Sequence, residues 1–254
     1  MSIPTNRFAI KIYAHFICMK VLHHLGLGDH LMLNGMVRYL RTKGPVSVVI
    51  HEPHLETIRF MYRDVDVGIV TVPDKTAQTV RECLGSGDVL PLATYAIPEN
   101  LWKFLCHGEG PLVTNWCHAV YNQAGVPIEY MRSRFRVDRD PIRELRAFKL
   151  TCLERGQYVY VHDDPERDRK IPVTGGLPVF RVSEWYTRLT NLFDYCLIIE
   201  NAAEVHCMHS SHSWLVELLG LGRKETNFFY NLECPHPYHS VKTVFTDDRW
   251  TFKN

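Results

Sequence analysis

The sequence predicts an α/β fold of two lobes, each with a parallel sheet and helices on both faces. Strand-like and helix-like segments alternate in both halves of the chain, which is typical of parallel sheets. The length of 254 residues suits two small lobes that share a cleft. Hydrophobic residues make up 46% and charged residues 22%, so a sizeable core is expected.

The first half predicts four strands joined by three helices. Runs rich in apolar and β-branched residues predict strands over 18–24, 46–53, 67–73 and 88–93. Apolar residues near helical spacing predict helices over 31–44, 54–64 and 75–85. Gly44 and Pro45 are expected to end the first of these helices.

The second half repeats the alternation after a helix over 139–155, with Asp140 as N-cap and Pro141 as its first residue. Strands are expected over 158–164, 178–182, 196–201, 226–232 and 241–248. Helices are expected over 183–195, capped by Ser183, and over 209–222, ending at Gly220 or Gly222. We place an N-terminal lobe at 1–150 and a C-terminal lobe at 151–254.

The composition excludes several classes of protein. A formal net charge of +1 gives no indication of nucleic acid or an anionic membrane as partner. The 8 cysteines include no CxxC pair, which predicts reduced, mostly buried thiols and a cytoplasmic location. No signal peptide is recognised, and no apolar run reaches the roughly 20 residues of a transmembrane helix. The sequence leaves the oligomeric state open.

A glycine-rich loop follows the first strand and reads Gly26-Leu27-Gly28-Asp29-His30. Ligands of parallel sheets bind at the carboxyl ends of strands, where glycines let the backbone approach and a following helix offers free N–H groups. Asp29 could take a proton from a sugar hydroxyl. Alternatively, the loop is a tight turn in which Asp29 caps the helix. Leu31 replaces the third glycine of GxGxxG, so the dinucleotide fingerprint is incomplete.

A second polar cluster follows the strand over 158–164 and contains His162, Asp163, Asp164, Arg167, Arg169 and Lys170. Paired acids at a strand end could bind a metal, hold a ribose or orient basic residues. The basic residues could neutralise a diphosphate, for which arginine offers bidentate geometry. The alternative is a solvated charged turn.

A third cluster opens the helix over 209–222 and contains His206, His209, Ser210, Ser211 and His212. Ser210 and Ser211 are natural caps, and the free amides of such a helix start suit a diphosphate. A plain capped helix is the alternative. No cysteine or acid clearly completes a zinc site with the three histidines, so no metal is expected.

Together the three clusters resemble a family pattern in Gly28-Asp29-His30-Leu31, in YVYVHDD over 158–164 and in VHCMHSSHS over 205–213. They are similar to GT-B glycosyltransferases, especially small bacterial, phage and large-DNA-virus members, and more distantly to heptosyltransferases. The resemblance implies two Rossmann-like lobes facing across a cleft. The N-terminal lobe would take the acceptor and the C-terminal lobe the nucleotide-sugar.

The resemblance also implies an activity: transfer of a sugar from a nucleoside-diphosphate sugar, by default a UDP-sugar, to a glycan hydroxyl. Asp29, or else His30, would act as base, inversion is preferred, and no metal or other cofactor is needed. The helix start at Ser210 and Ser211 and a cation of the second cluster would hold the diphosphate; the other donor-site candidates are Gly26, Gly28, His162, Asp163, Asp164, Arg167, Arg169, Lys170, His206, His209 and His212. His209 stands where heptosyltransferases carry an aspartate. The acceptor would be a surface or viral capsid glycan, made in the host cytoplasm if the chain is viral.

Three other classes stay open on the sequence: a nucleotide-sugar epimerase, an NAD-dependent oxidoreductase and a non-catalytic protein that binds nucleotide or glycan. Turnover of donor alone would indicate the epimerase, and NADH binding the oxidoreductase. Tolerance of substitutions at Asp29 and in 162–170 would indicate the non-catalytic protein. The sequence has no GxSxG elbow, HExxH, Walker A or EF-hand pattern, which argues against serine hydrolases and ATPases.

Overall fold

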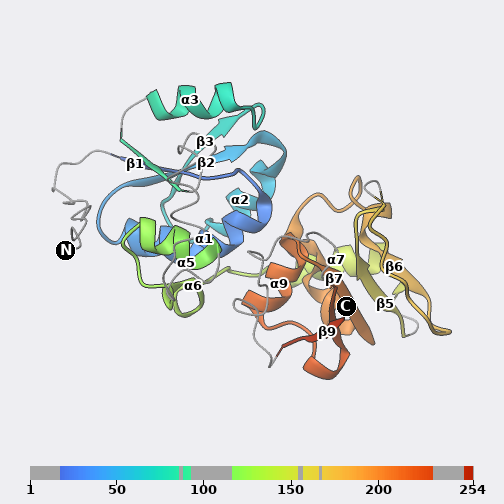
Figure 1. Ribbon diagram of the computed structural model, residues 1–254. Helices are drawn as coiled ribbons and strands as arrows, with labels where there is room; N and C mark the ends of the chain where they lie inside the picture. The colour runs from blue at the N-terminus through green and yellow to red at the C-terminus, as the bar shows by residue number, and fades with distance from the viewer. Residues whose placement is uncertain are drawn as a thin grey trace, which may run out of the picture.

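The structure is a computed structural model that describes residues 18–85, 88–92, 116–153, 157–165, 168–230 and 249–253. It contains two parallel sheets, each packed against helices (Figure 1). The predicted α/β class with two Rossmann-like lobes is therefore confirmed. The expected strand over 241–248 lies outside the described residues.

The first sheet contains β1 (Met19–Leu22), β2 (Val46–His51), β3 (Gly68–Val72) and β4 (Val89–Pro91), in the order β3-β2-β1-β4. All its pairings are parallel. Residues of β2 alternate between two cores: Val48 and Ile50 face one, and Val49 the other. Helix α3 (Ala77–Gly85) covers one face, and α1 (Leu27–Arg41), α2 (Leu55–Met61) and α5 (Trp116–Gln123) cover the other (Figure 1).

The second sheet has the order β6-β5-β7-β8-β9 and is also parallel throughout. Its strands are β5 (Val159–His162), β6 (Val179–Arg181), β7 (Glu204–Met208), β8 (Asn227–Tyr230) and β9 (Thr251–Lys253). Its helices are α7 (Pro141–Leu150), α8 (Cys196–Asn201) and α9 (Ser211–Leu219).

Helices on both faces of this second sheet were expected, and among the described residues the α-helices pack on one face. Apolar residues of α7, α8 and α9 share one core with Tyr160 and Cys207. On the other face, Val161 and Met208 pack instead against Ile171 and neighbouring residues. The described residues of the connection between β5 and β6 form no α-helix, and Ile171 of this connection packs on this face.

Two predicted elements of the second half are wrong. Residues 183–195 form no α-helix but two separate 3-10 turns, η4 (Val182–Glu184) and η5 (Leu192–Tyr195). The predicted strand over 196–201 is α8, with Cys196, Ile198 and Ile199 buried. A short apolar run does not distinguish a buried strand from a buried helical turn. In the sheet, the place beside β5 is taken by β7.

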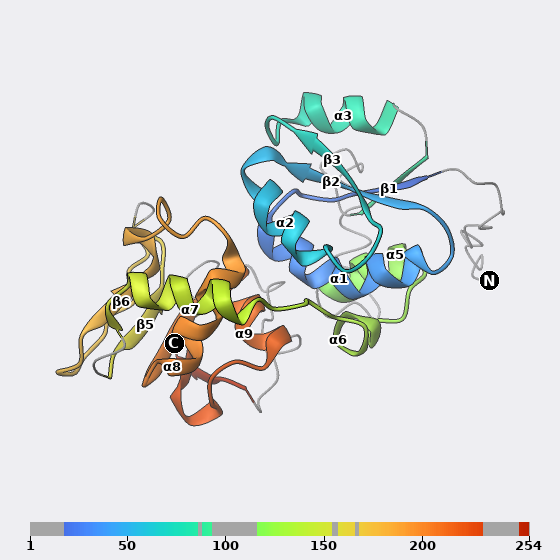
Figure 2. The same cartoon turned by 180° about the vertical axis from the view of Figure 1, so that it is seen from behind.

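The start of α7 confirms its predicted cap. The Asp140 carboxylate accepts hydrogen bonds from the backbone N–H groups of Ile142, at 3.1 Å, and Arg143, at 2.9 Å. Although α7 lies within the N-terminal lobe predicted over 1–150, it packs against α8 and η5 of the second half (Figure 2). The division into lobes at residues 150 and 151 remains a prediction from the sequence.

The six cysteines within the described residues are free thiols. Cys117, Cys196 and Cys207 are buried, whereas Cys18 and Cys152 are exposed, so the expectation of mostly buried thiols holds for half of them. Among the helices of the described part of the chain, none combines the length and the apolar character needed to cross a membrane.

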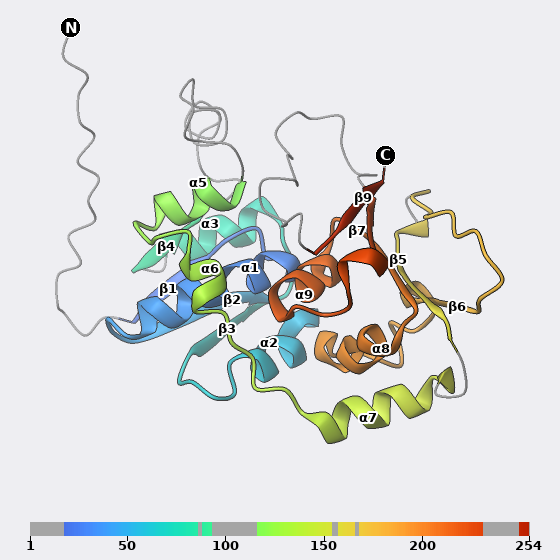
Figure 3. The same cartoon turned by 90° about the horizontal axis from the view of Figure 1, so that it is seen from below.

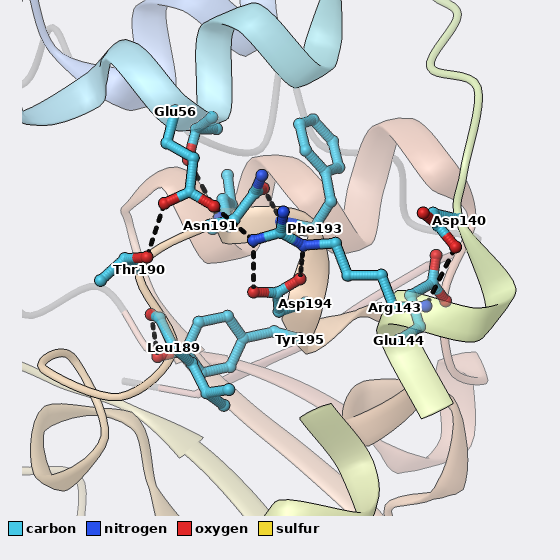
Figure 4. Close-up of polar contacts among 12 residues, drawn as sticks. Glu56, Asp140, Arg143, Glu144, Leu189, Thr190, Asn191, Phe193, Asp194 and Tyr195 are labelled. Carbon is cyan, nitrogen blue, oxygen red and sulfur yellow. Dashed lines mark hydrogen bonds and ion pairs between the residues drawn. The ribbon is translucent and has the colours of Figure 1, made fainter. Parts of the chain in front are cut away.

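Arg143 joins elements of both halves in one polar network (Figure 4). Its guanidinium, on α7, forms ion pairs with Asp194 of η5 and with Glu56 of α2. Thr190 donates a hydrogen bond to Glu56 at 2.7 Å. Two hydrogen bonds lower the pKa of Glu56 below its ordinary 4.5: the one from Thr190 has the larger effect and the one from Arg143 the smaller. The network fixes α2 of the first lobe against η5 and α7.

Replacement of Arg143 by methionine is expected to destabilise the protein by about 1–3 kcal/mol, because the Asp194 carboxylate would lose its cation while almost buried. The side chain of Asp194 is 8% exposed. Denaturant unfolding of the purified variant measures the loss. Arg146→Met is the matched control, because Arg146 is an exposed residue of the same helix. Equal stability of the two variants would contradict the role given to Arg143.

Candidate active site

Helices α1 and α9 lie side by side where the two lobes touch (Figure 3), and the first turns of both are in contact. A Cβ atom added to Gly28, in the first turn of α1, would lie 3.1 Å from Trp214 Cδ1 and 3.5 Å from the backbone nitrogen of Ser211. Ser211 is the first residue of α9. Since each helix start carries a partial positive charge, their juxtaposition favours an anion close by.

The start of α9 is closed by a reciprocal pair of serines. Ser210, the predicted cap, accepts a hydrogen bond from the Ser213 backbone N–H at 3.4 Å, and Ser213 Oγ accepts one from Ser210 N–H at 3.0 Å. The first bond from residue i to i−4 within this turn runs from Trp214 to Ser210. The amides of Ser211 and His212 precede it and are the ones that a bound anion could use. Gly220 ends the helix, as predicted, with a φ of 68°.

Helix α1 begins earlier than predicted, so Gly28, Asp29 and His30 lie in its first turn and not in a loop. Gly26 is the N-cap and no side chain caps this end, so the alternative in which Asp29 is the cap is wrong. The carboxylate of Asp29 is 24% exposed, and its Oδ2 lies 3.9 Å from His23 Nδ1. A Cβ atom on Gly26 would lie 2.7 Å from that same oxygen, so this glycine leaves room for the carboxylate.

His30 is buried behind Asp29, with an exposed fraction of 1%. Its Nδ1 lies 3.0 Å from His23 Nε2. Burial is the main cause that lowers the pKa of His30 well below 6.5, and the charge of His23 lowers it further. Asp29 is therefore the more accessible of the two predicted bases.

Asp163 and Asp164, the acids that follow β5, mainly stabilise the conformation of the loop in which they lie. Asp163 is buried, accepts a hydrogen bond from Ile171 N–H at 3.0 Å, and pairs with Arg181. Asp164 and Arg169 form a backbone bridge, with N···O distances of 3.0 and 2.9 Å. Lys170 is exposed, and the predicted Arg167 lies outside the described residues. Of the roles that the sequence left open for these acids, Asp163 has that of pairing with a basic residue, Arg181.

An aromatic stack ties the first turn of α9 to β5. The rings of His162 and His212 are stacked with centroids 4.1 Å apart, and His212 Nδ1 lies 2.5 Å from the hydroxyl of Tyr160. Burial is the main cause that lowers the pKa of His212 well below 6.5, and the charge of His162 lowers it further. The imidazole of His212 therefore carries no positive charge at neutral pH. His162 Nε2 contacts the hydroxyl of Tyr186 at 2.9 Å.

The structure separates the predicted histidines of this third cluster. His206 lies within β7, where its two ring nitrogens lie 2.9 Å from Tyr230 Oη and from Glu204 Oε2. His209 lies beside the start of α9, with its ring centroid 6.3 Å from that of Trp214. The described residues contain no group of three or more histidine, cysteine, aspartate or glutamate side chains arranged to hold a metal ion.

Sequence reasoning missed a group of basic side chains at the same edge of the first sheet. His23 follows β1, His54 follows β2 in the turn η1 (Glu52–His54), and Lys75 follows β3. Burial is the main cause that lowers the pKa of His23, His30 and His54, and the positive charge of Lys75 lowers all three further. The rule that ligands bind at the carboxyl ends of strands, used here for the first strand, would also have found the residues after the second and third.

This geometry defines a two-lobed α/β protein of the GT-B-like kind. The chain is similar in structure to the glycosyl transferase family 9 protein of Veillonella parvula DSM 2008, with a TM-score of 0.53 and 12% sequence identity. The similarity covers 93% of this chain and 86% of that one, and at this identity it shows the shared fold. No family model matches the chain, and no curated protein matches it significantly.

Proposed function

We propose that the protein is a glycosyltransferase that moves a sugar from a nucleoside-diphosphate sugar to a hydroxyl group of a glycan. The contact between Gly28 of α1 and Ser211 of α9 carries this proposal. It brings a partly exposed carboxylate, that of Asp29, near a helix start of the other lobe that suits a diphosphate. The glycosyl transferase name of the structurally similar protein supports the same class.

In the proposed reaction, Asp29 accepts the proton of the acceptor hydroxyl, whose oxygen attacks the anomeric carbon of the donor. The bond from that carbon to the diphosphate oxygen breaks, and the diphosphate leaves with the electron pair. Amides of Ser211 and His212 stabilise the charge that develops on the leaving group. Arg169 or Lys170 would add a positive charge. A single base suits inversion at the anomeric carbon, and no step requires a metal.

The finer features of the proposal rest on the sequence alone. A UDP-sugar as donor, a surface or capsid glycan as acceptor and a cytoplasmic location remain predictions. A screen of nucleoside diphosphates by thermal shift would identify the nucleotide, because a ligand that binds the folded state raises the melting temperature.

Ser211→Glu is expected to weaken binding of the nucleoside diphosphate by at least about tenfold, because it adds a negative charge at the helix start proposed to hold the diphosphate. Calorimetry would measure this, with whichever of UDP, ADP, GDP and CDP binds the wild-type protein. Ser211→Gln is the control of similar size without the charge and should bind more tightly than the glutamate variant. Unchanged affinity in both variants would place the phosphate site elsewhere.

A further inference from the structure

The hydrogen bonds around His23 and His30 determine which nitrogen carries the proton in each ring. The backbone N–H of Leu25 donates to His23 Nδ1 at 3.1 Å, so this nitrogen carries a lone pair. The proton of neutral His23 is therefore on Nε2, from which it is donated to His30 Nδ1 at 3.0 Å. It follows that neutral His30 carries its own proton on Nε2. Burial lowers the pKa of His23 to about 3, so the pair stays uncharged at neutral pH.

The resulting Nε2–H group of His30 is buried and has no hydrogen-bond partner among the described residues. A buried donor without a partner is rare in folded proteins, because it has lost its hydration without gaining a hydrogen bond. The loop that sets its tautomer also contains Leu25 at a φ of 62°, a left-handed conformation that non-glycine residues seldom adopt. Such local costs concentrate at ligand-binding sites.

Other polar groups lie around this donor, and one of them, Lys75, is positively charged. His54 Nε2 is a second buried nitrogen without a partner among the described residues. After the larger effect of burial, the positive charge of Lys75 lowers the pKa of His23, His30 and His54. Burial lowers the pKa of Lys75 itself, and the negative charge of Asp29 raises it. These residues follow three neighbouring parallel strands, at the edge of the sheet where ligands bind.

We propose that His30 is a substrate-binding residue whose Nε2–H donates to an oxyanion, a carboxylate or phosphate, carried by the acceptor sugar. Lys75 would offset the charge of this oxyanion, close to the hydroxyl that Asp29 deprotonates. The proposal rests on the proposed function, because it names the class of acceptor for the same site. It also gives His30 a role other than that of a base, because Nδ1 accepts the hydrogen bond from His23 and Nε2 already carries a proton.

Nitrogen-15 NMR of the histidine-labelled full chain tests this without any nucleotide. Long-range spectra should show the Nε2–H tautomer for His23 and His30. Addition of D-glucuronate or D-glucose 6-phosphate should shift the His30 Nε2–H signal, whereas D-glucose should not. The two acids distinguish a carboxylate from a phosphate ligand.

Lys75→Gln should weaken binding of the effective acid by at least about tenfold, and Lys43→Gln, which removes an equal charge at the far end of α1, should not. Because Lys75 is exposed, its variant should fold. An Nδ1–H tautomer for His30, or equal shifts with glucose, or no shift with either acid would overturn the proposal. Donor binding at α9 is measured separately, so failure here is distinct from failure of the proposed function.

Discussion

Asp29→Asn is expected to lower the rate of sugar transfer by about 10²- to 10⁴-fold while the fold stays intact. Asparagine has nearly the shape of aspartate but does not accept the proton of the attacking hydroxyl. The carboxylate has the required access, since it is 24% exposed and Gly26 leaves space beside its Oδ2. Release of the nucleoside diphosphate in the presence of donor and acceptor measures the rate.

Two comparisons separate the loss of a base from a general effect of charge. Asp140→Asn removes a carboxylate from the start of α7 and keeps a capping side chain, so transfer should stay close to that of the wild type. Asp29→Asn should bind the nucleoside diphosphate about as well as the wild type, because that site is assigned to α9. Undiminished transfer by a folded Asp29→Asn variant would rule out Asp29 as the base.

Gly35→Ala is expected to cost roughly 3 kcal/mol of stability, at the upper end of the cost of overpacking. The added Cβ atom would lie 1.9 Å from the carbonyl oxygen of Tyr130 and 3.3 Å from the backbone nitrogen of Phe135. Both contacts are with backbone, so α1 and α6 (Tyr130–Ser133) would have to move apart. Helix propensity alone would instead favour alanine by about 1 kcal/mol.

The melting temperature is the simplest measurement, and a loss of this size corresponds to roughly 6–12 °C for a chain of this length. Gly44→Ala is the matched control, because a Cβ atom there meets nothing within 4 Å. Its melting temperature should equal or slightly exceed that of the wild type. Equal stability of the two variants would show that α1 and α6 adjust to the added methyl group without cost.

Local patterns explain which elements were predictable. Residues 46–51 are rich in β-branched residues and follow a glycine-proline break, and they form β2. Asp140 before Pro141 indicates a helix start. The aspartate carboxylate accepts hydrogen bonds from free amides of the first turn, and proline suits the first helical position because it has no N–H group there to satisfy. The run over 196–201 carries no such signal, and its apolar residues suit a buried helix as well as a strand.

By itself, the sequence determined the α/β class, most strands and the helix starts at Pro141 and near Ser210, because periodicity and capping act between residues close in the chain. The tertiary structure alone decided that Gly28 lies against Ser211 and that Gly35 lies against Tyr130. These pairs are far apart in sequence, and their contacts depend on how whole helices pack. The proton positions in His23 and His30 likewise follow from burial and hydrogen bonds that exist only in the folded chain.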